Sequence, residues 1–183
     1  LRDAFFYNNV SGTAAVIGGL TAGDSYTLSA VIPNQPTRSE LSSLDPGPAL
    51  VPTSQEVPEE LTARLEEYVT GIEEPGDRLV AMLAGLAADG YISHGISDDE
   101  PPSRSGHAAD RIAELLTAPR MIGDAEQYAV TAALMARDIG FPARVVIGFV
   151  PTGEQVRGED ISAWIAANTA QYGWVTIDPH PPV

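Results

Sequence analysis

Few residues in this chain have side chains suited to chemistry, and their types and spacing argue against a metal site. The sequence contains no cysteine and only three histidines, His94, His107 and His180, none of which lies four residues from another. An acidic run, Asp98 to Glu100, lacks the spacing of an EF-hand loop and is followed at once by two prolines. We therefore expect surface or capping histidines, a solvated acidic loop, and no metal or cofactor.

The strongest local pattern places a short polar stretch at the start of a helix. Gly123 and Asp124 supply a turn and an N-cap, and small apolar residues then recur at helical spacing from Ala125 to Ile139. Gly140 and the proline that follows it end the helix, and Ala143–Phe149 forms a β-branched run typical of a covered strand. Asp124, Glu126 and Gln127 are consequently candidate binding residues at an exposed helix start.

Two longer stretches of sequence resemble a known family. The run GDAEQYA, followed by ALMARDIGFPARVVIGF, resembles the nucleophile helix and next strand of bacterial transglutaminase-like domains. The run DISAWIAANTAQYGWVTIDPHPP resembles the two strands that carry the other catalytic positions of that family. Because these domains are relatives of the papain-like cysteine enzymes, the resemblance implies a papain-like core over about residues 59–182.

The chain departs from the family at the positions that perform catalysis. Ala125 stands where the resemblance places the cysteine nucleophile, and Ser162 stands where it places the histidine. Of the triad positions only Asp178 is kept. A methyl group cannot attack a carbonyl, and a hydroxyl without a neighbouring base is a poor nucleophile. We therefore expect no catalytic residue, with Ala125, Ser162 and Asp178 as vestigial triad positions.

Trp164 is a further candidate for the vestigial cleft. It follows Ser162 by two residues, so both side chains should share one strand face, where the indole could line or plug the cleft. Asp178, without the histidine it would orient, could bond Ser162 or cap the end of the hairpin. The residues leave these alternatives open.

The remaining pattern predicts an α+β fold with helices before an antiparallel sheet and no βαβ alternation. Expected helices cover 58–71, 77–88 and 107–117, ahead of the helix from Ala125; expected strands at the C-terminus cover 161–167 and 174–177. Early strands are expected at 4–8, 13–17 and 25–32. We divide the chain into a β-rich segment (1–33), a Pro/Ser-rich linker (34–57) and a transglutaminase-like domain (58–183).

Composition narrows the choice of partners. The chain has 25 acidic and 10 basic residues, a formal net charge of -15, and no basic cluster. This balance argues against nucleic acid or an anionic lipid surface as a partner. No uninterrupted apolar stretch approaches the roughly 20 residues of a membrane span. The chain begins within a β-rich stretch, so we expect it to be a piece of a longer protein.

These observations predict a catalytically inactive domain that binds a protein or peptide, with a component of the cell envelope as one candidate. The resemblance implies an extracytoplasmic position in bacteria, as part of a longer membrane-anchored chain. The alternative is an acyl-transfer or hydrolase enzyme with a rebuilt site around Ser162 and Asp178. A third interpretation makes the domain a folded spacer.

Overall fold

The structure of the chain is a computed structural model that describes residues 4–9, 13–27, 29–93, 95 and 100–182. Two compact units make it up, Leu1–Ile32 and Pro33–Val183. Within the described ranges, no helix combines the length and the apolar character needed to cross a bilayer. His94, Asp98 and Asp99 lie outside the described residues.

The first unit contains one β-hairpin. Strand β1 (Phe5–Asn8) pairs antiparallel with β2 (Thr13–Val16), which confirms the first two expected strands. The third expected strand, 25–32, is wrong: its described residues have no strand structure. Val31 and Ile32 are 94% and 86% exposed. An alternating sequence does not form a stable strand without a neighbour to satisfy its backbone and cover one face.

Residues 34–57, where we expected a linker, begin with structured contacts in the second unit. The 3-10 helix η2 (Arg38–Ser43) packs against helix α2 (Pro75–Asp89), where Gly76 permits the close approach of the Ser42 backbone. Leu44 follows at 1% exposure in the core, and Gly47 N donates to Asn168 O at 2.9 Å. Beyond this attachment Leu50 is 99% exposed.

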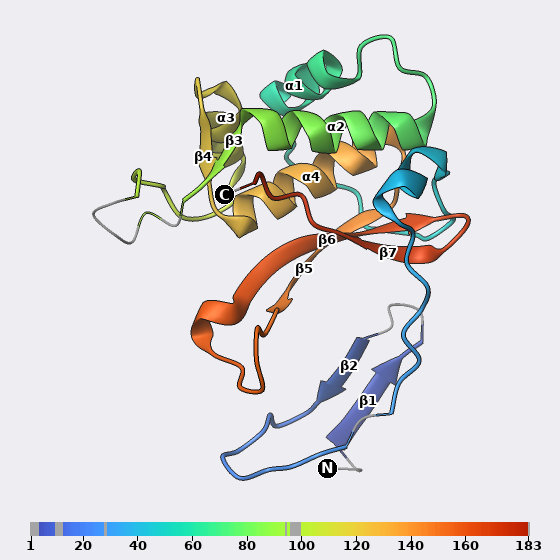
Figure 1. Ribbon diagram of the computed structural model, residues 1–183, viewed down its shortest axis with the longest axis vertical. Coiled ribbons are helices and arrows are strands. Elements are labelled where there is room, and N and C mark those ends of the chain that lie inside the picture. The colour runs from blue at the N-terminus through green and yellow to red at the C-terminus, as the bar shows by residue number, and fades with distance from the viewer. Residues whose placement is uncertain (1–3, 10–12, 28, 94, 96–99, 183) are drawn as a thin grey trace. The chain divides into compact units, whose positions relative to one another are not determined.

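All of the expected helices are present, with small changes at their ends. They are α1 (Glu59–Val69), α2 (Pro75–Asp89) and α3 (Ala109–Thr117), followed by the central helix α4 (Ala125–Ile139). Gly140 ends α4 in the left-handed region with φ of 118°, a conformation that glycine adopts without steric cost. Figure 1 shows α2 and α4 stacked on the same side of the main sheet.

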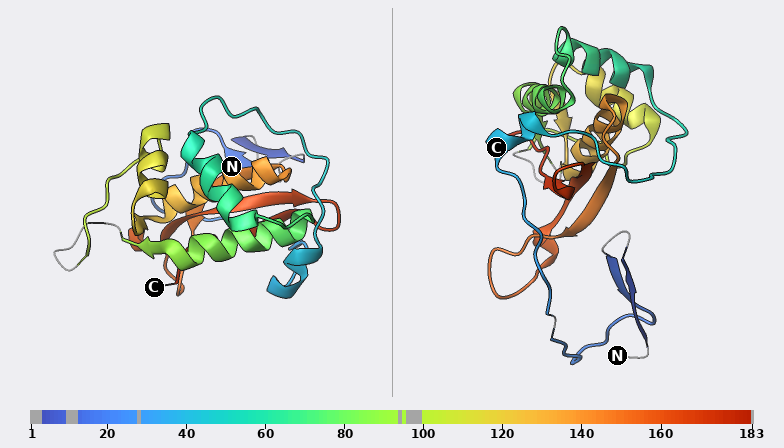
Figure 2. Two further views of the ribbon diagram at one scale, coloured as in Figure 1. Left: turned by 90° about the horizontal axis from the view of Figure 1, so that it is seen from above. Right: turned by 90° about the vertical axis from the view of Figure 1, so that its right-hand side faces the viewer.

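The main sheet is antiparallel, as expected, with strand order β5–β6–β7. Its strands are β5 (Ala143–Phe149), β6 (Ile161–Thr169) and β7 (Gly173–Ile177). β6 is therefore the central strand, while β5 and β7 each have one edge without a partner strand in this sheet. In Figure 2 the helices lie over one face of this sheet.

The structure contains one short βαβ unit, although the sequence showed no βαβ alternation. β3 (Gly90–Ile92) pairs parallel with β4 (Met121–Gly123), and α3 lies between them in sequence. Three-residue strands are too short for their period to be recognised in a sequence. This small pair matters for function because β4 leads directly into the N-cap of α4.

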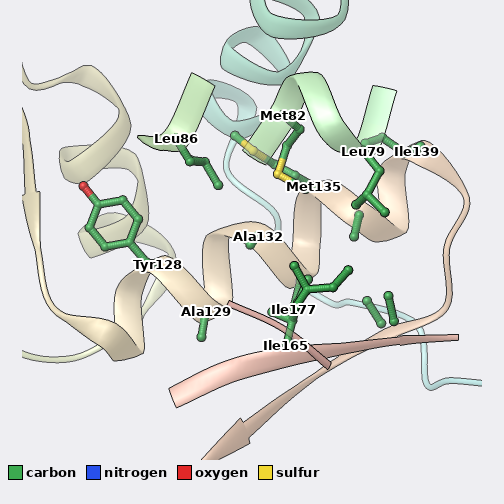
Figure 3. Packing of buried hydrophobic residues seen from close by; sticks show 14 of the residues in the cluster. Leu79, Met82, Leu86, Tyr128, Ala129, Ala132, Met135, Ile139, Ile165 and Ile177 are labelled. Atoms are coloured by element: carbon green, nitrogen blue, oxygen red, sulfur yellow. The ribbon is translucent and has the colours of Figure 1, made fainter. Parts of the chain in front are cut away.

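The core forms where α4 contacts both the other helices and the sheet. In Figure 3 the small side chain of Ala129 points toward the sheet strands that carry Ile165 and Ile177, which lets the helix axis approach the sheet closely. On the opposite side Met135 meets Leu79 and Met82 of α2. With both sides of α4 packed, its first turn is held in place near the start of β6 and the end of β7.

Candidate functional site

The start of α4 is built as a satisfied helix N-terminus. The Asp124 carboxylate accepts hydrogen bonds from the backbone of Glu126 at 3.0 Å and of Gln127 at 3.2 Å. In return the Gln127 side chain accepts from Asp124 N at 2.9 Å, which completes a capping box. Ala125 is the first helical residue, and its side chain is only a methyl group.

The other two candidate residues at this helix start have local partners. Glu126 contacts His107 Nδ1 and keeps 35% of its side chain exposed. Gln127 is completely buried, and its amide nitrogen donates to Gly106 O at 2.8 Å and Arg104 O at 3.2 Å. Both side chains thus contact the segment before α3, and Gln127 is not presented to a ligand.

Ser162 and Trp164 lie near the start of β6 on one face of the strand. Ala163 and Ile165 alternate with them, and these two are buried at 4% and 0% exposure in the core beneath α4. Side chains of successive strand residues point to opposite faces, so Ser162 and Trp164 face away from α4. The Trp164 ring instead lies over Gly148 of β5, where a Cβ would come within 2.7 Å of it.

Asp178, directly after β7, holds a histidine that the sequence did not single out. Asp178 Oδ1 accepts from the backbone of His180 at 3.0 Å and lies 2.9 Å from its Nδ1. The first contact is an Asx turn, in which an aspartate bonds the backbone two residues on. Among the described residues Asp178 is not bonded to Ser162. Asp-Pro-His in the sequence was the available signal for this pair.

His180 brings its ring to the start of α4. Its side chain is 20% exposed, and its Nε2 is buried without a hydrogen-bond partner in the described chain. Burial lowers the pKa of His180, but Asp178 raises it by more, helped by the nearby carbonyls of Ala163 and Ala125, so the pKa lies above its ordinary value. The hydrogen bond from His180 lowers the pKa of Asp178 in spite of partial burial.

The residues that meet at this point are therefore Ala125, Asp178 and His180, without the Ser162 side chain. An imidazole held by a carboxylate beside a helix N-terminus can accept a proton from a nucleophile. Ala125 supplies no such nucleophile. We call this arrangement the α4 cleft. Pro181, the next residue, is buried and approaches Gly90, which lies between α2 and β3.

No group of three or more metal-binding side chains occurs among the residues that the structure describes. His107 and His180 are each paired with a carboxylate, and the two sites contain no further histidine within the described ranges.

The C-terminal segment also lines a depression in the surface. A cavity of about 380 Å³ is lined by residues of 36–41, by four residues on the outer side of α2, and by residues 176–180. The α2 residues are Val80, Leu83, Ala84 and Ala87. We call this cavity the α2–β7 groove. Its volume falls within the roughly 300–1,000 Å³ of ligand pockets.

Comparisons with known proteins agree with this architecture. The sequence matches the profile of the transglutaminase-like superfamily over residues 62–179. Two similar crystal structures are those of the periplasmic domain of TgpA from Pseudomonas aeruginosa, alone and bound to ethylmercury, each with a TM-score of 0.56 and 21% identity. Each match covers 78% of this chain but only 46% or 48% of the other, so the chain spans about half their length. No curated protein sequence matches it.

Proposed function

This chain belongs to the transglutaminase-like superfamily, and from that premise we propose that it is a pseudoenzyme, a domain that binds a protein or peptide and transfers no acyl group. The observation that carries the proposal is Ala125. It is the first residue of α4, where a thiolate would gain from the free amides and dipole of the helix. Its methyl group offers no electron pair, and the full sequence has no cysteine to replace it.

The geometry around Ser162 favours this proposal over a rebuilt hydroxyl enzyme. A serine nucleophile needs a base within hydrogen-bond distance. The Asp178–His180 pair lies near Ala125, whereas Ser162 is on the strand face opposite to buried Ala163. The base and the hydroxyl are thus separated by the strand itself.

We also propose an extracytoplasmic location. The support is the likeness to a domain described as periplasmic, together with the family match over residues 62–179. In this setting the domain presents a stable fold to a protein or peptide of the cell envelope, as one part of a longer chain.

Acyl transfer by the unmodified chain is the direct test. We expect neither incorporation of a labelled amine into a glutamine-containing peptide nor hydrolysis of that peptide or of an activated ester. Assays run with the unmodified chain and with Ser162→Ala should give the same background rate. Turnover that disappears in Ser162→Ala would overturn the pseudoenzyme proposal and favour the hydroxyl enzyme.

A positive arm separates a dead site from an unfolded protein. Ser162 faces away from α4, so a photoreactive residue placed there reports on partners of that face in the full-length protein. Circular dichroism shows whether the domain is folded. Discrete adducts support a binding role for that face, and a folded protein with only scattered background would show that no partner contacts it.

A further inference from the structure

The α4 cleft and the α2–β7 groove share residues of the C-terminal segment. In the cleft, His180 Nε2 is buried and has no hydrogen-bond partner in the described chain. The groove is lined by Asp178, Pro179 and His180 of this segment and is open to solvent along α2, where Ala84 is exposed. A peptide can therefore enter the groove without displacing any part of the core.

One wall of the groove is apolar and belongs to α2. Leu83, Ala84 and Ala87 are spaced so that they share one side of the helix, and Leu41 of η2 adds to them. All four are at least partly exposed. The small alanines leave space in front of the helix, so an apolar side chain of a ligand can be covered there.

The second wall contains main-chain hydrogen-bonding groups that are not paired with another strand. β7 is an edge strand, and Thr176 N points away from β6. This amide donates to the side-chain oxygen of Gln35 at 2.8 Å, where a neighbouring strand would supply a backbone carbonyl. A side chain from an exposed segment is a replaceable acceptor, so an extended peptide can pair with this edge.

The charge of the groove points to an anionic ligand group. Arg38 lines it and has no ion pair or hydrogen bond among the described residues. Asp178, the carboxylate in the lining, is already paired with His180. The available charge is therefore one guanidinium, which binds carboxylates in a bidentate manner.

From these features we propose that the α2–β7 groove binds an extended peptide with an apolar side chain next to a carboxylate. The apolar side chain lies against Ala84 and Ala87, the carboxylate pairs with Arg38, and the peptide main chain takes the place of Gln35 at Thr176. This inference rests on the proposed binding function and names its site and ligand class.

The probe is an N-acetylated tripeptide mixture, acetyl-Xaa-Val-Leu, prepared both as free acids and as C-terminal amides. Binding to the chain is followed by two-dimensional NMR of the backbone amides. We expect saturable shifts at Ala84, Ala87 and Thr176 with the free acids. The amides should bind at least about tenfold more weakly, because a charge-assisted hydrogen bond is lost.

Matched variants test each contact. Arg38→Gln should weaken binding of the free acids by about tenfold and remove the preference for acids over amides, whereas Arg157→Gln, an exposed arginine outside the groove, should change neither. Ala84→Trp should block binding, and Ala88→Trp, one turn further along α2 and outside the lining, should not.

Three results would overturn the inference: no saturable shift in the groove, equal binding of acids and amides, or unchanged binding by Arg38→Gln. Failure of the proposed function has a different signature. Acyl transfer by the unmodified chain would overturn the pseudoenzyme and leave the peptide titration unaffected, while loss of groove binding without turnover would overturn the groove alone.

Discussion

The C-terminal segment from Asp178 to Pro181 takes part in two sites that differ in chemistry. At the α4 cleft, His180 lies beside Ala125, and its imidazole has a carboxylate partner and no nucleophile to serve. Asp178, Pro179 and His180 also line the α2–β7 groove, where Arg38 and the edge of β7 have capacity for a partner. The same short segment thus holds the imidazole of one site and forms a wall of the other.

This difference teaches that loss of a nucleophile and loss of a whole active site are separate events. Around Ala125 the helix cap, the helix and the Asp178–His180 pair are all present, and what the cleft lacks is a reacting atom. The groove needs no reacting atom, because burial, charge and main-chain pairing are sufficient for binding. Four predictions test how far the two sites are independent.

The largest effect is expected where the groove is attached to the core. Leu44 is 1% exposed and follows η2, so Leu44→Ala should leave a cavity and lower the free energy of unfolding by about 2–5 kcal/mol. Urea unfolding followed by circular dichroism measures the change. Leu50→Ala is the matched control, because Leu50 is 99% exposed and its removal should have almost no effect. Equal stability of the two variants would mean that residues 38–44 are not part of the folded unit.

In the α4 cleft, Ala125→Cys should create a reactive thiol without any change at Ser162. The helix N-terminus and His180 both favour the thiolate, so the introduced thiol should have a pKa below the usual ~8.5. We expect alkylation by iodoacetamide at pH 6 to be about tenfold faster in Ala125→Cys than in Ala125→Cys with His180→Gln. Because the natural chain has no cysteine, mass spectrometry reports on this thiol alone.

Ser162→Cys provides the comparison for that experiment. Its thiol should titrate near the ordinary value and respond little to His180→Gln, because Ser162 lies on the strand face away from the cleft. A pH profile of Ala125→Cys that is unchanged by His180→Gln would show that the imidazole does not act on position 125.

The sequence was sufficient to predict the central framework for physical reasons that are local. Asp124 caps α4, small residues on α4 permit close packing on the sheet, and Gly140 ends the helix in a left-handed conformation. Each of these signals lies within one element, so neither long-range geometry nor a partner is needed to recognise it. The resemblance to transglutaminase-like domains assigned these elements to one family. The match over residues 62–179 shows that family.

The role of His180 could not be predicted from the same kind of signal. His180 is distant in sequence from Ala125, and only the packing of the C-terminal segment over α4 brings them together. Similarly, the sequence placed Ser162 at a catalytic position, but the alternation of β6 turns its side chain away from α4. A shift of one residue along a strand moves each side chain to the opposite face of the sheet, and the sequence alone did not determine which side chains of β6 point toward α4.

A smaller effect is expected at the edge of β7. Gln35→Ala removes the acceptor for Thr176 N and should lower stability by about 0.5–1.5 kcal/mol or less, since water can replace the exposed side chain. Hydrogen exchange of the Thr176 amide should become faster, with no change at amides inside β6. The same variant should bind the free-acid tripeptides at least as well as the natural chain. Weaker binding would show that Gln35 contacts the ligand instead of competing with it.

The smallest effect concerns the pH dependence of the Asp178–His180 pair. The pKa of His180 is raised, so its contribution is complete below the pKa of an unfolded histidine and is lost as pH rises through the folded value. The pKa of Asp178 is lowered, so its contribution is present above the pKa of an unfolded aspartate and is lost as pH falls through the folded value. The pair should therefore stabilise the fold most in mildly acidic solution.

Urea midpoints of the natural chain and of His180→Gln, measured between pH 5.5 and 8.5, test this. The natural chain should lose stability relative to the variant as pH rises across that interval. The relative change should be only on the order of a few tenths of a kcal/mol, because the Asp178 side chain is 73% exposed and solvent screens the pair. Added salt should reduce it further. A relative change of opposite sign would mean that burial, and not Asp178, dominates the titration of His180, and that the cleft holds a neutral imidazole.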